Sequence, residues 1–274
     1  MPARLFEPGA IGGSIMSAHL LAAASNDMGS DRAAAPASCG PCLANKLGFC
    51  AMIRGKVESQ ANDHPGAPLL IGSVHTIPAR RTICQPNEWS EFVTIICDGW
   101  ATSSLALPDG RRQIVSFLLP GDLVSWNLFE PTSDRLIESV TDVTYRNFRR
   151  SDLIRMLRES PEFFEKLMSI CVQYTRRADQ RLLDLGRRTA DERIARMILV
   201  LTNKLAKRGM CRDRMGQDRI DFPLRQHHIA DAMGLTPVHV SKVLSRFRRD
   251  QLIEIDGRSL KVLDQTRLRR VATM

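Results

Sequence analysis

The stretch Gln226–Asp250 reads QHHIADAMGLTPVHVSKVLSRFRRD and decides the fold of the C-terminal part of the chain. Ala230, Gly234 and Val240 fall at the spacing of a helix-turn-helix. The small residue lets two helices approach, the glycine forms a tight turn, and the β-branched residue packs the second helix onto the first. The spacing therefore predicts two short helices joined at Gly234.

The second of these helices is predicted to have one apolar face and one basic face. Thr236 is a favourable N-cap for it, and Pro237 takes the first helical position, where proline is tolerated. The residues expected to face inward are Val240, Val243, Leu244 and Phe247, and those left outside are Ser241, Lys242, Ser245, Arg246, Arg248 and Arg249. The alternative is a core helix with a solvated face. Because the turn, the cap and the basic side chains occur together, they favour DNA binding.

Composition agrees with a polyanionic partner. The chain has 274 residues, enough for two modest domains, and 43% of them are hydrophobic. Its net charge of +9 and pI near 9.6 make polyanions plausible partners, and the basic residues crowd after Arg146. No apolar run is long enough to span a membrane. The weakly apolar run Ile15–Ala24 is short and broken by His19, so we expect no signal peptide and a cytoplasmic location.

Three cysteines cluster after an N-terminal segment, residues 1–38, that we predict to be disordered. They are Cys39, Cys42 and Cys50 in the run CGPCLANKLGFC. This spacing can bring three thiols to one metal centre, and it favours a metal or redox site over a disulfide framework. Structural zinc is coordinated by four ligands, usually including a second pair of cysteines with similar spacing, and that second pair is missing here. An iron–sulfur cluster is also coordinated by four thiolates, and the fourth is often distant in sequence.

From about Leu69 to Phe148 the sequence changes to short apolar runs separated by turns. Pro108-Asp-Gly110 between two such runs is a strong hairpin signal. Closely spaced strands with such turns predict a β-roll or small barrel. The runs are Ile83, Phe92–Ile96, Leu105–Leu107, Ile114–Leu119 and Val140–Tyr145.

A long helix is predicted to follow. Ser151–Arg155 opens a helical region, and Pro161 begins a pattern that continues past Leu185. An apolar stripe on so long a helix suits a two-helix seam, which predicts a homodimer. The alternative, a helix packed on its own β-roll, stays open. The stripe contains Phe163, Phe164, Leu167, Ile170, Cys171, Tyr174, Leu182, Leu183 and Leu185.

The remaining elements complete a winged domain. Thr189 and Glu192 form the pattern of a capping box that opens a helix over residues 190–208. Cys211–Asp221 is polar and is predicted to be a loop. Two strands with an Asp-Gly turn, Leu252–Ile255 and Ser259–Val262, are predicted after the helix-turn-helix, followed by a short basic tail.

The order of these parts resembles the Crp/Fnr transcription regulators, from Cys39 to the end of the chain. The resemblance implies an α+β fold: an N-terminal β-roll of the cyclic-nucleotide-binding type over 39–150, a dimerisation helix over 151–188 and a winged helix-turn-helix over 189–274. The segments that carry it are Leu118–Val124 (LLPGDLV), Thr189–Ile194 (TADERI) with Lys207–Gly209, and Ile229–Phe247.

The cysteine spacing is similar to that of alphaproteobacterial Fnr-type oxygen sensors. These hold a [4Fe-4S] cluster on three N-terminal cysteines and one central cysteine, and they bind palindromic DNA as dimers while the cluster is intact. The resemblance thus implies a cluster on Cys39, Cys42 and Cys50. The family's central cysteine corresponds here to Arg146, so we expect Cys97 as the fourth ligand, with Cys84 as the alternative. A small buried hydrophobe is the expected role of Cys84.

The outer face of the second helix departs from the Fnr pattern of glutamate, serine and arginine, which here reads Val238, Ser241 and Lys242. A valine can contact only a thymine methyl group, so we expect a half-site that differs at that base. Lys242 can still reach guanine acceptors. The remaining side chains of this face are expected to hold phosphates: Thr236, His239 and Arg246.

The sequence therefore predicts a non-enzymatic, DNA-binding transcription regulator with an oxygen- or redox-labile iron–sulfur cluster. The implied partners are palindromic double-stranded DNA, a second copy of the chain and RNA polymerase, with no membrane. The alternatives are a regulator that senses through zinc or a thiol switch, and, less favoured, a cyclic-nucleotide-responsive regulator or an iron–sulfur electron carrier. No cyclic nucleotide is expected, because Gly121-Asp122 is followed by no Arg-Ser or Arg-Thr pair before Phe148.

Overall fold

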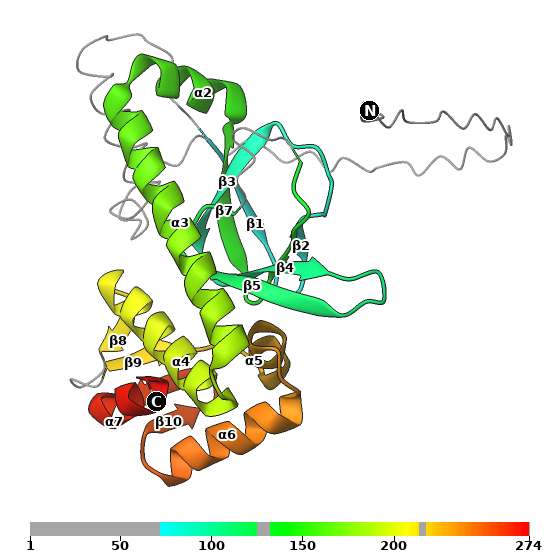
Figure 1. The fold of residues 1–274 in the computed structure, drawn as a ribbon. Coiled ribbons are helices and arrows are strands. Elements are labelled where there is room, and N and C mark those ends of the chain that lie inside the picture. The colour runs from blue at the N-terminus through cyan, green and yellow to red at the C-terminus, as the bar shows by residue number, and fades with distance from the viewer. Residues whose placement is uncertain (1–71, 125–131, 214–217, 274) are drawn as a thin grey trace, which may run out of the picture. The chain divides into compact units, whose positions relative to one another are not determined.

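The structure, a computed structural model, describes residues 72–124, 132–213 and 218–273. All of them belong to one compact unit, Pro36–Met274. The predicted disordered segment 1–38 and the three clustered cysteines at 39, 42 and 50 lie outside the described residues. Within the described parts, seven strands precede three helices, and a winged helix-turn-helix follows (Figure 1).

The first seven strands form two antiparallel sheets, which confirms the β-roll. One has the order β1-β7-β3 and the other the order β2-β6-β4-β5. A cluster that includes Ile96, Ala101, Ile137 and Val143 fills the roll. The strands are β1 (Ser73–Ile77), β2 (Thr82–Cys84), β3 (Phe92–Asp98), β4 (Ala101–Ala106), β5 (Arg112–Leu118), β6 (Leu136–Ser139) and β7 (Val143–Arg149).

The predicted hairpin at Pro108-Asp-Gly110 is confirmed, since β4 and β5 pair antiparallel around it. The predicted strand Val140–Tyr145 is confirmed only from Val143 on, where β7 begins, because residues 140–142 form the turn between β6 and β7. In that turn the side-chain oxygen of Thr141 accepts a hydrogen bond from the backbone N–H of Trp100, at 2.9 Å. Apolar content alone did not reveal this turn. Nor did it reveal β1, whose side chains are mostly exposed.

Three helices follow the roll: α2 (Arg150–Glu159), α3 (Pro161–Arg187) and α4 (Ala190–Lys207). The side chain of Ser160 accepts a hydrogen bond from the N–H of Phe163 and caps α3. The predicted capping box of α4 is confirmed, because the Thr189 hydroxyl and the Glu192 carboxylate each accept a bond from the other residue's backbone N–H. The Ser160 cap separates α2 from α3, and the Thr189 cap separates α3 from α4.

The C-terminal domain, α4 to α7, has the winged helix-turn-helix fold. It contains β8 (Cys211–Asp213), β9 (Asp218–Asp221), α5 (Gln226–Met233), α6 (Pro237–Arg249), β10 (Ile253–Asp256), β11 (Ser259–Val262) and α7 (Gln265–Thr273). The wing is confirmed, but it belongs to a larger sheet of order β10-β11-β9-β8.

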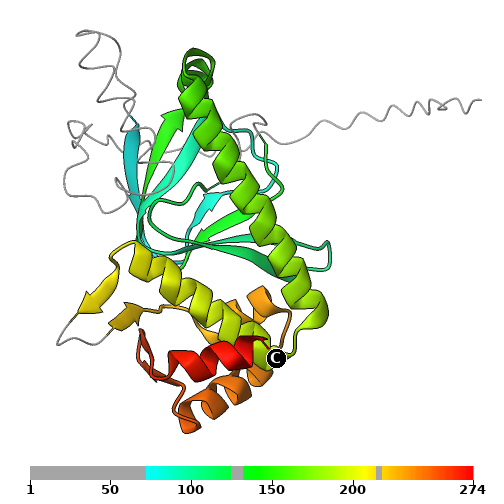
Figure 2. The same cartoon turned by 60° about the vertical axis from the view of Figure 1, so that its left-hand side comes forward.

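Two predictions for this domain are corrected. Cys211–Asp221 is not a simple loop, because β8 and β9 pair with each other and β9 pairs with β11. The basic tail is not a mere extension: it forms α7, which packs on α4 (Figure 2). Leu268 and Ala272 are buried on its inner face. The short sequence contains only these few apolar positions, too few to predict a helix alone.

The roll and the C-terminal domain share one hydrophobic cluster. Trp100, Ile114, Phe117 and Leu119 of the roll belong to the same buried group as the helices α4 to α6. A second cluster, with Val93, Phe148 and Phe163 among its members, joins the β1-β7-β3 sheet to α2 and α3. Within the described parts of the chain, none of the helices combines the length and apolar character required to cross a bilayer.

Candidate nucleic-acid interface

The turn between α5 and α6 has the geometry that the sequence predicts. Gly234 has φ 64° and ψ 42°, in the left-handed region, where a residue without Cβ is favoured. The N–H of Leu235 then donates to the carbonyl oxygen of Ala230 at 3.1 Å, which closes the end of α5. Ala230 is buried between the helices. The helix-turn-helix is therefore confirmed residue by residue.

Helix α6 is fixed by its cap and by its apolar face. The Thr236 hydroxyl accepts a hydrogen bond from the N–H of His239 at 3.2 Å, and Pro237 follows the cap. All four residues predicted to face inward are buried: Val240, Val243, Leu244 and Phe247. Burial of this face fixes which side chains of α6 point away from the protein.

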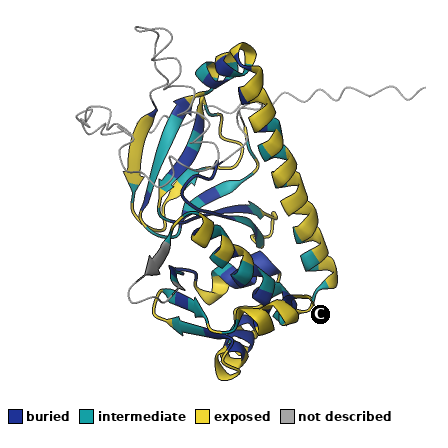
Figure 3. Cartoon of the chain, turned by 90° about the vertical axis from the view of Figure 1, so that its left-hand side faces the viewer, coloured by how far each residue is buried: buried dark blue, intermediate teal, exposed yellow. Residues whose placement is uncertain are grey.

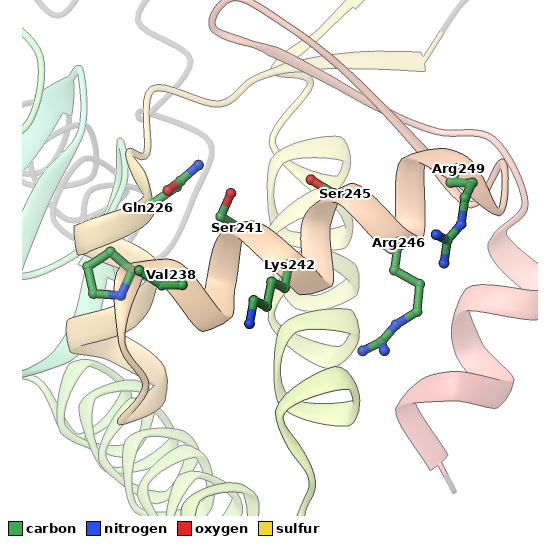
Figure 4. A pocket seen from close by; sticks show the side chains of 8 residues that line it. Gln226, Val238, Ser241, Lys242, Ser245, Arg246 and Arg249 are labelled. Atoms are coloured by element: carbon green, nitrogen blue, oxygen red, sulfur yellow. The ribbon is translucent and has the colours of Figure 1, made fainter.

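The outer face of α6 borders a shallow depression of about 690 Å³ (Figure 4). Lys242, Arg246 and Arg249 line it from successive turns, and Gln226 borders it from α5. None of its lining residues is acidic. A concavity with three cations on one helix is suited to the phosphates and base edges of a nucleic acid.

Of the predicted site residues, Val238, Ser241, Lys242 and Arg246 line this depression, whereas Thr236 and His239 are not among its lining residues. Val238 is 65% exposed at the start of the helix, so its methyl groups are available to a partner. His239 and Lys242 are exposed and Ser241 is half-buried. Gln226, Ser245 and Arg249 were missed as site residues. The regular spacing of Val238, Ser241, Ser245 and Arg249 along one helix face could have identified the last two.

Arg246 has a partner that the sequence did not reveal. Its guanidinium forms an ion pair with the carboxylate of Asp191 in the first turn of α4. Because Asp191 is distant in sequence, helical spacing gave no sign of this contact. The ion pair orients Arg246 at the rim of the depression, and both side chains are partly exposed.

Histidines occupy the start of α5. The rings of His227 and His228 have centroids 4.0 Å apart. His228 Nδ1 accepts a hydrogen bond from the N–H of Arg225 at 3.1 Å. Burial, followed by the charges of His227 and Arg112, lowers the pKa of His228 to about 4. This imidazole is therefore neutral at physiological pH.

The two cysteines weighed as a fourth ligand lie in different surroundings. Cys84 packs against the core of the roll, and burial together with the charge of Glu88 raises the pKa of its thiol. Cys97 lies in β3 where the pairing with β7 shifts register between Ile96 and Asp98. Its Sγ lies 3.9 Å from the carbonyl oxygen of Ile95, and the residue is half-buried.

Arg146 lies on β7, the central strand of its sheet, and pairs with Ile95 of β3 and Val74 of β1. Cys97 is therefore on the neighbouring strand, two residues beyond the residue that pairs with Arg146. In the described ranges no group of three or more His, Cys, Asp or Glu side chains could hold a metal ion. The other three predicted ligands lie outside those ranges.

Helix α3 has two apolar faces. Phe163 and Leu167 are buried against the cluster that joins α3 to the roll. A neighbouring stripe, which we call the seam, is less covered: Phe164 is 47% and Leu182 is 71% exposed. Figure 3 shows that much of α3 is exposed. The seam residues follow alternating steps of four and three: Phe164, Met168, Cys171, Thr175, Ala178 and Leu182. Met168 and Cys171 also pack against the cluster between α3 and the roll, and Thr175 is polar.

Two family profiles match the chain. The profile described as a Crp-like helix-turn-helix domain matches residues 192–271, which contain most of the C-terminal domain. The profile described as a cyclic nucleotide-binding domain matches residues 74–160, which contain the roll and α2. The two matches thus divide between the parts of the chain on either side of α3.

Relatives and solved structures extend these matches. A probable transcriptional activator of Rhizobium leguminosarum bv. viciae is 32% identical over 190 residues, covering 69% of this chain and 76% of its own. The transcriptional activator protein FnrL of Cereibacter sphaeroides is 29% identical over 230 residues, covering 83% and 92%. The structure of FixK2 from Bradyrhizobium japonicum superposes with a TM-score of 0.66 at 28% identity, covering 74% and 98%.

Proposed function

The chain belongs to the Crp/Fnr family of transcription regulators, and from this premise we propose that it binds a palindromic operator as a homodimer. The observation that carries this proposal is the outer face of α6, where three cations and an exposed valine border one depression without an acidic lining residue. In a helix-turn-helix the second helix enters the major groove.

The side chains of α6 divide into two roles in this proposal. Val238 and Lys242 contact bases, the first through a thymine methyl group and the second through guanine acceptors. Ser241 lies between them. The residues proposed to hold phosphates are Thr236, His239 and Arg246. Such contacts position the protein on DNA without selecting a base sequence. The Thr236 oxygen already accepts a capping bond, but its hydroxyl hydrogen can still donate to a phosphate.

The homodimer is supported by the seam on α3. Alternating steps of four and three residues keep an apolar stripe on one side of a helix, which is the pattern of a two-helix coiled coil. Leu182 at 71% exposure is an unusual position for a leucine unless another surface covers it. Pairing two α3 helices would place two α6 helices about one turn of DNA apart.

Selection from a random duplex library, followed by fluorescence anisotropy with the selected duplex, tests the DNA-binding proposal. We expect a palindrome, a steep decrease in affinity with salt, and a loss of roughly tenfold in the Lys242→Ala variant. Lys207→Ala, at an exposed lysine at the end of α4, is the matched control and should bind as the wild type does. If no duplex is enriched, the proposal is wrong.

We propose that this regulator responds to oxygen or redox state through an iron–sulfur cluster. Cys39, Cys42 and Cys50 would hold it, and the half-buried Cys97 beside the Arg146 position would be the fourth thiolate. The raised pKa of Cys84 disfavours its thiolate, which counts against Cys84 as a ligand. A [4Fe-4S] cluster would supply oxygen-labile redox chemistry at this place.

Anaerobic purification tests the cluster. We expect a brown protein that absorbs near ~400 nm and loses this band in air. Cys97→Ser should reduce the iron content, whereas the matched Cys84→Ser variant should retain it. A colourless protein with one zinc per chain, or with no metal and a reversible disulfide, would replace the cluster with zinc or thiol-switch sensing.

The other parts of the proposal follow from the family. RNA polymerase is the expected protein partner, the expected location is the cytoplasm, and no enzymatic activity is proposed. We propose the domain division given by the sequence: residues 39–150, 151–188 and 189–274. Residues 125–131, part of the stretch between Gly121 and Phe148 on which the absence of a cyclic nucleotide was predicted, lie outside the described residues.

A further inference from the structure

Asp122 is a buried carboxylate in the loop that follows β5. The residue is 5% exposed, and its Oδ2 accepts a hydrogen bond from the N–H of Leu119 at 2.9 Å. Two cations at the C-terminal end of α4 reach it: Lys204 Nζ lies 2.5 Å from Oδ2, and Nη2 of Arg208, the C-cap residue, lies 2.6 Å from Oδ1. A single side chain of the roll thus pairs with two side chains of the C-terminal domain.

The same arginine makes a second bond to this loop. Arg208 Nη1 donates to the carbonyl oxygen of Pro120 at 2.5 Å, so its guanidinium spans the turn from Pro120 to Asp122. Of the family-like segments found in the sequence, LLPGDLV and the Lys207–Gly209 segment therefore meet in one contact. The planar guanidinium fixes the direction of approach as well as the distance.

The charges of this group depend on one another. Burial alone would raise the pKa of Asp122, but Lys204 and Arg208 lower it below its usual value, so the carboxylate is ionised. Burial lowers the pKa of Lys204, and the charge of Asp122 opposes that effect. Removing the carboxylate would leave two poorly solvated cations side by side, which disfavours the present position of α4.

We propose that Asp122 is a positioning residue for DNA binding, which acts through Lys204 and Arg208 to fix the C-terminal domain on the roll. The proposal rests on the proposed DNA-binding function. It assigns to Asp122 the orientation of α6 and no contact with DNA.

Helix α4 connects the Asp122 contact to the recognition helix α6. Asp122 holds α4 near its C-terminal end, and Asp191 in its first turn pairs with Arg246 of α6. At 1.5 Å per residue, these two contacts lie roughly 20 to 25 Å apart along the helix. A small tilt at the Arg208 end therefore becomes a displacement of the recognition helix at the other end.

A second contact between the roll and the C-terminal domain has a different character. Arg112 Nε lies 2.7 Å from Asp231 Oδ2, and Gln113 Nε2 donates to the carbonyl oxygen of Ala232 at 2.9 Å. Arg112 and Asp231 remain about a third exposed, so solvent screens their interaction. The buried Asp122 group is therefore the stronger constraint on orientation.

The test compares two duplexes with the full-length protein: the palindrome selected by the wild type, and the same palindrome with two base pairs inserted between its half-sites. Because a dimer with fixed domains requires one half-site spacing, the wild type should strongly prefer the first duplex. In Asp122→Asn this preference should fall by ~10-fold or more, with each half-site still bound. Asp109→Asn, an exposed carboxylate of the β4–β5 turn, is the control and should keep the preference.

Arg208→Gln provides a second path to the same result if Asp122→Asn fails to fold. Because the two side chains share one contact, the double variant should lose less preference than the sum of the losses in the two single variants. An unchanged preference in folded variants would overturn the proposal. So would an equal loss of affinity for both duplexes, which marks a structural defect only. Failure of the wild type to bind any duplex would instead refute the proposed function.

Discussion

Helices α6 and α3 both carry an apolar stripe, but only the stripe of α6 is fully buried within the chain. The inward-facing apolar residues of α6 are buried inside the C-terminal domain, with Val240 and Val243 at 0% exposure. On α3, Phe163 and Leu167 are buried while Phe164 and Leu182 on the neighbouring stripe stay exposed. Both helices have strong amphipathic patterns, so sequence periodicity alone did not separate these two outcomes.

The difference separates two kinds of function. A helix whose apolar face is satisfied within the chain can present its polar face to a ligand, as α6 presents its cations. A helix with an uncovered apolar stripe calls for another protein surface, as the seam of α3 does. Four variants, taken from the largest expected effect to the smallest, test this distinction.

Phe247→Ala should cause the largest loss, because Phe247 is 2% exposed and joins α6 to the core of the domain. We expect the free energy of unfolding to fall by about 3–5 kcal/mol, measured by urea denaturation followed by circular dichroism. Val238→Ala, on the exposed face of the same helix, should change stability by less than about 0.5 kcal/mol. Equal effects of the two variants would show that α6 is not packed as described.

Leu182→Glu should weaken DNA binding without destabilising the folded chain. Because Leu182 is 71% exposed in the single chain, the variant should keep the fold of each chain. A charge in the seam should nevertheless weaken the affinity for the selected palindrome by ~100-fold, about 2.7 kcal/mol. Val200→Glu on α4, at 52% exposure, is the matched control. If both variants bind the palindrome as the wild type does, the seam is not an interface.

His228, in helix α5, should give a smaller, pH-dependent effect on the stability of the fold. Folding lowers its pKa from 6.5 to about 4, so between these values the unfolded chain holds a proton that the folded chain does not. Stability should therefore be full above pH 6.5 and fall as the pH decreases toward 4. Since the ring is partly exposed, we expect at most about 2 kcal/mol.

His228→Gln should flatten that part of the curve of melting temperature against pH. The exposed His239 on α6 supplies the control, and His239→Gln should leave the curve unchanged. A wild-type curve without a decrease between pH 6.5 and 4 would contradict the burial of His228.

Thr236→Ala should have the smallest effect. The hydroxyl caps α6 by accepting a bond from His239 N–H, and its loss should cost about 1 kcal/mol of unfolding free energy. Thr236→Ser keeps the oxygen and should restore most of this stability. A Ser variant no better than the Ala variant would show that the hydroxyl is not a cap.

Local patterns made much of this fold predictable. The glycine turn, the caps at Thr189 and Thr236 and the Pro-Asp-Gly hairpin each depend on a few neighbouring residues, and each is confirmed. Contacts between distant residues were not predictable in the same way. The strand pairs of β9 with β11, the ion pair of Arg246 with Asp191 and the buried Asp122 group have no local signature.

Arg193, in the TADERI segment, also makes contacts that could not be predicted from the sequence. Its guanidinium donates to the carbonyl oxygens of Met233 at 2.9 Å and Leu185 at 2.6 Å, so it joins the end of α3 to the end of α5. The sequence showed an arginine typical of the family, but only the fold shows which helix ends it connects.

The stoichiometry of the complex with DNA tests the central claim most directly. That claim is that the seam of α3 pairs two chains so that two α6 helices bind one palindrome. Sedimentation of the full-length protein with the selected duplex should give a complex that contains twice the 30.7 kDa of one chain, formed in a single step. Stepwise binding of single chains, with a half-site duplex bound as tightly as the palindrome, would contradict it.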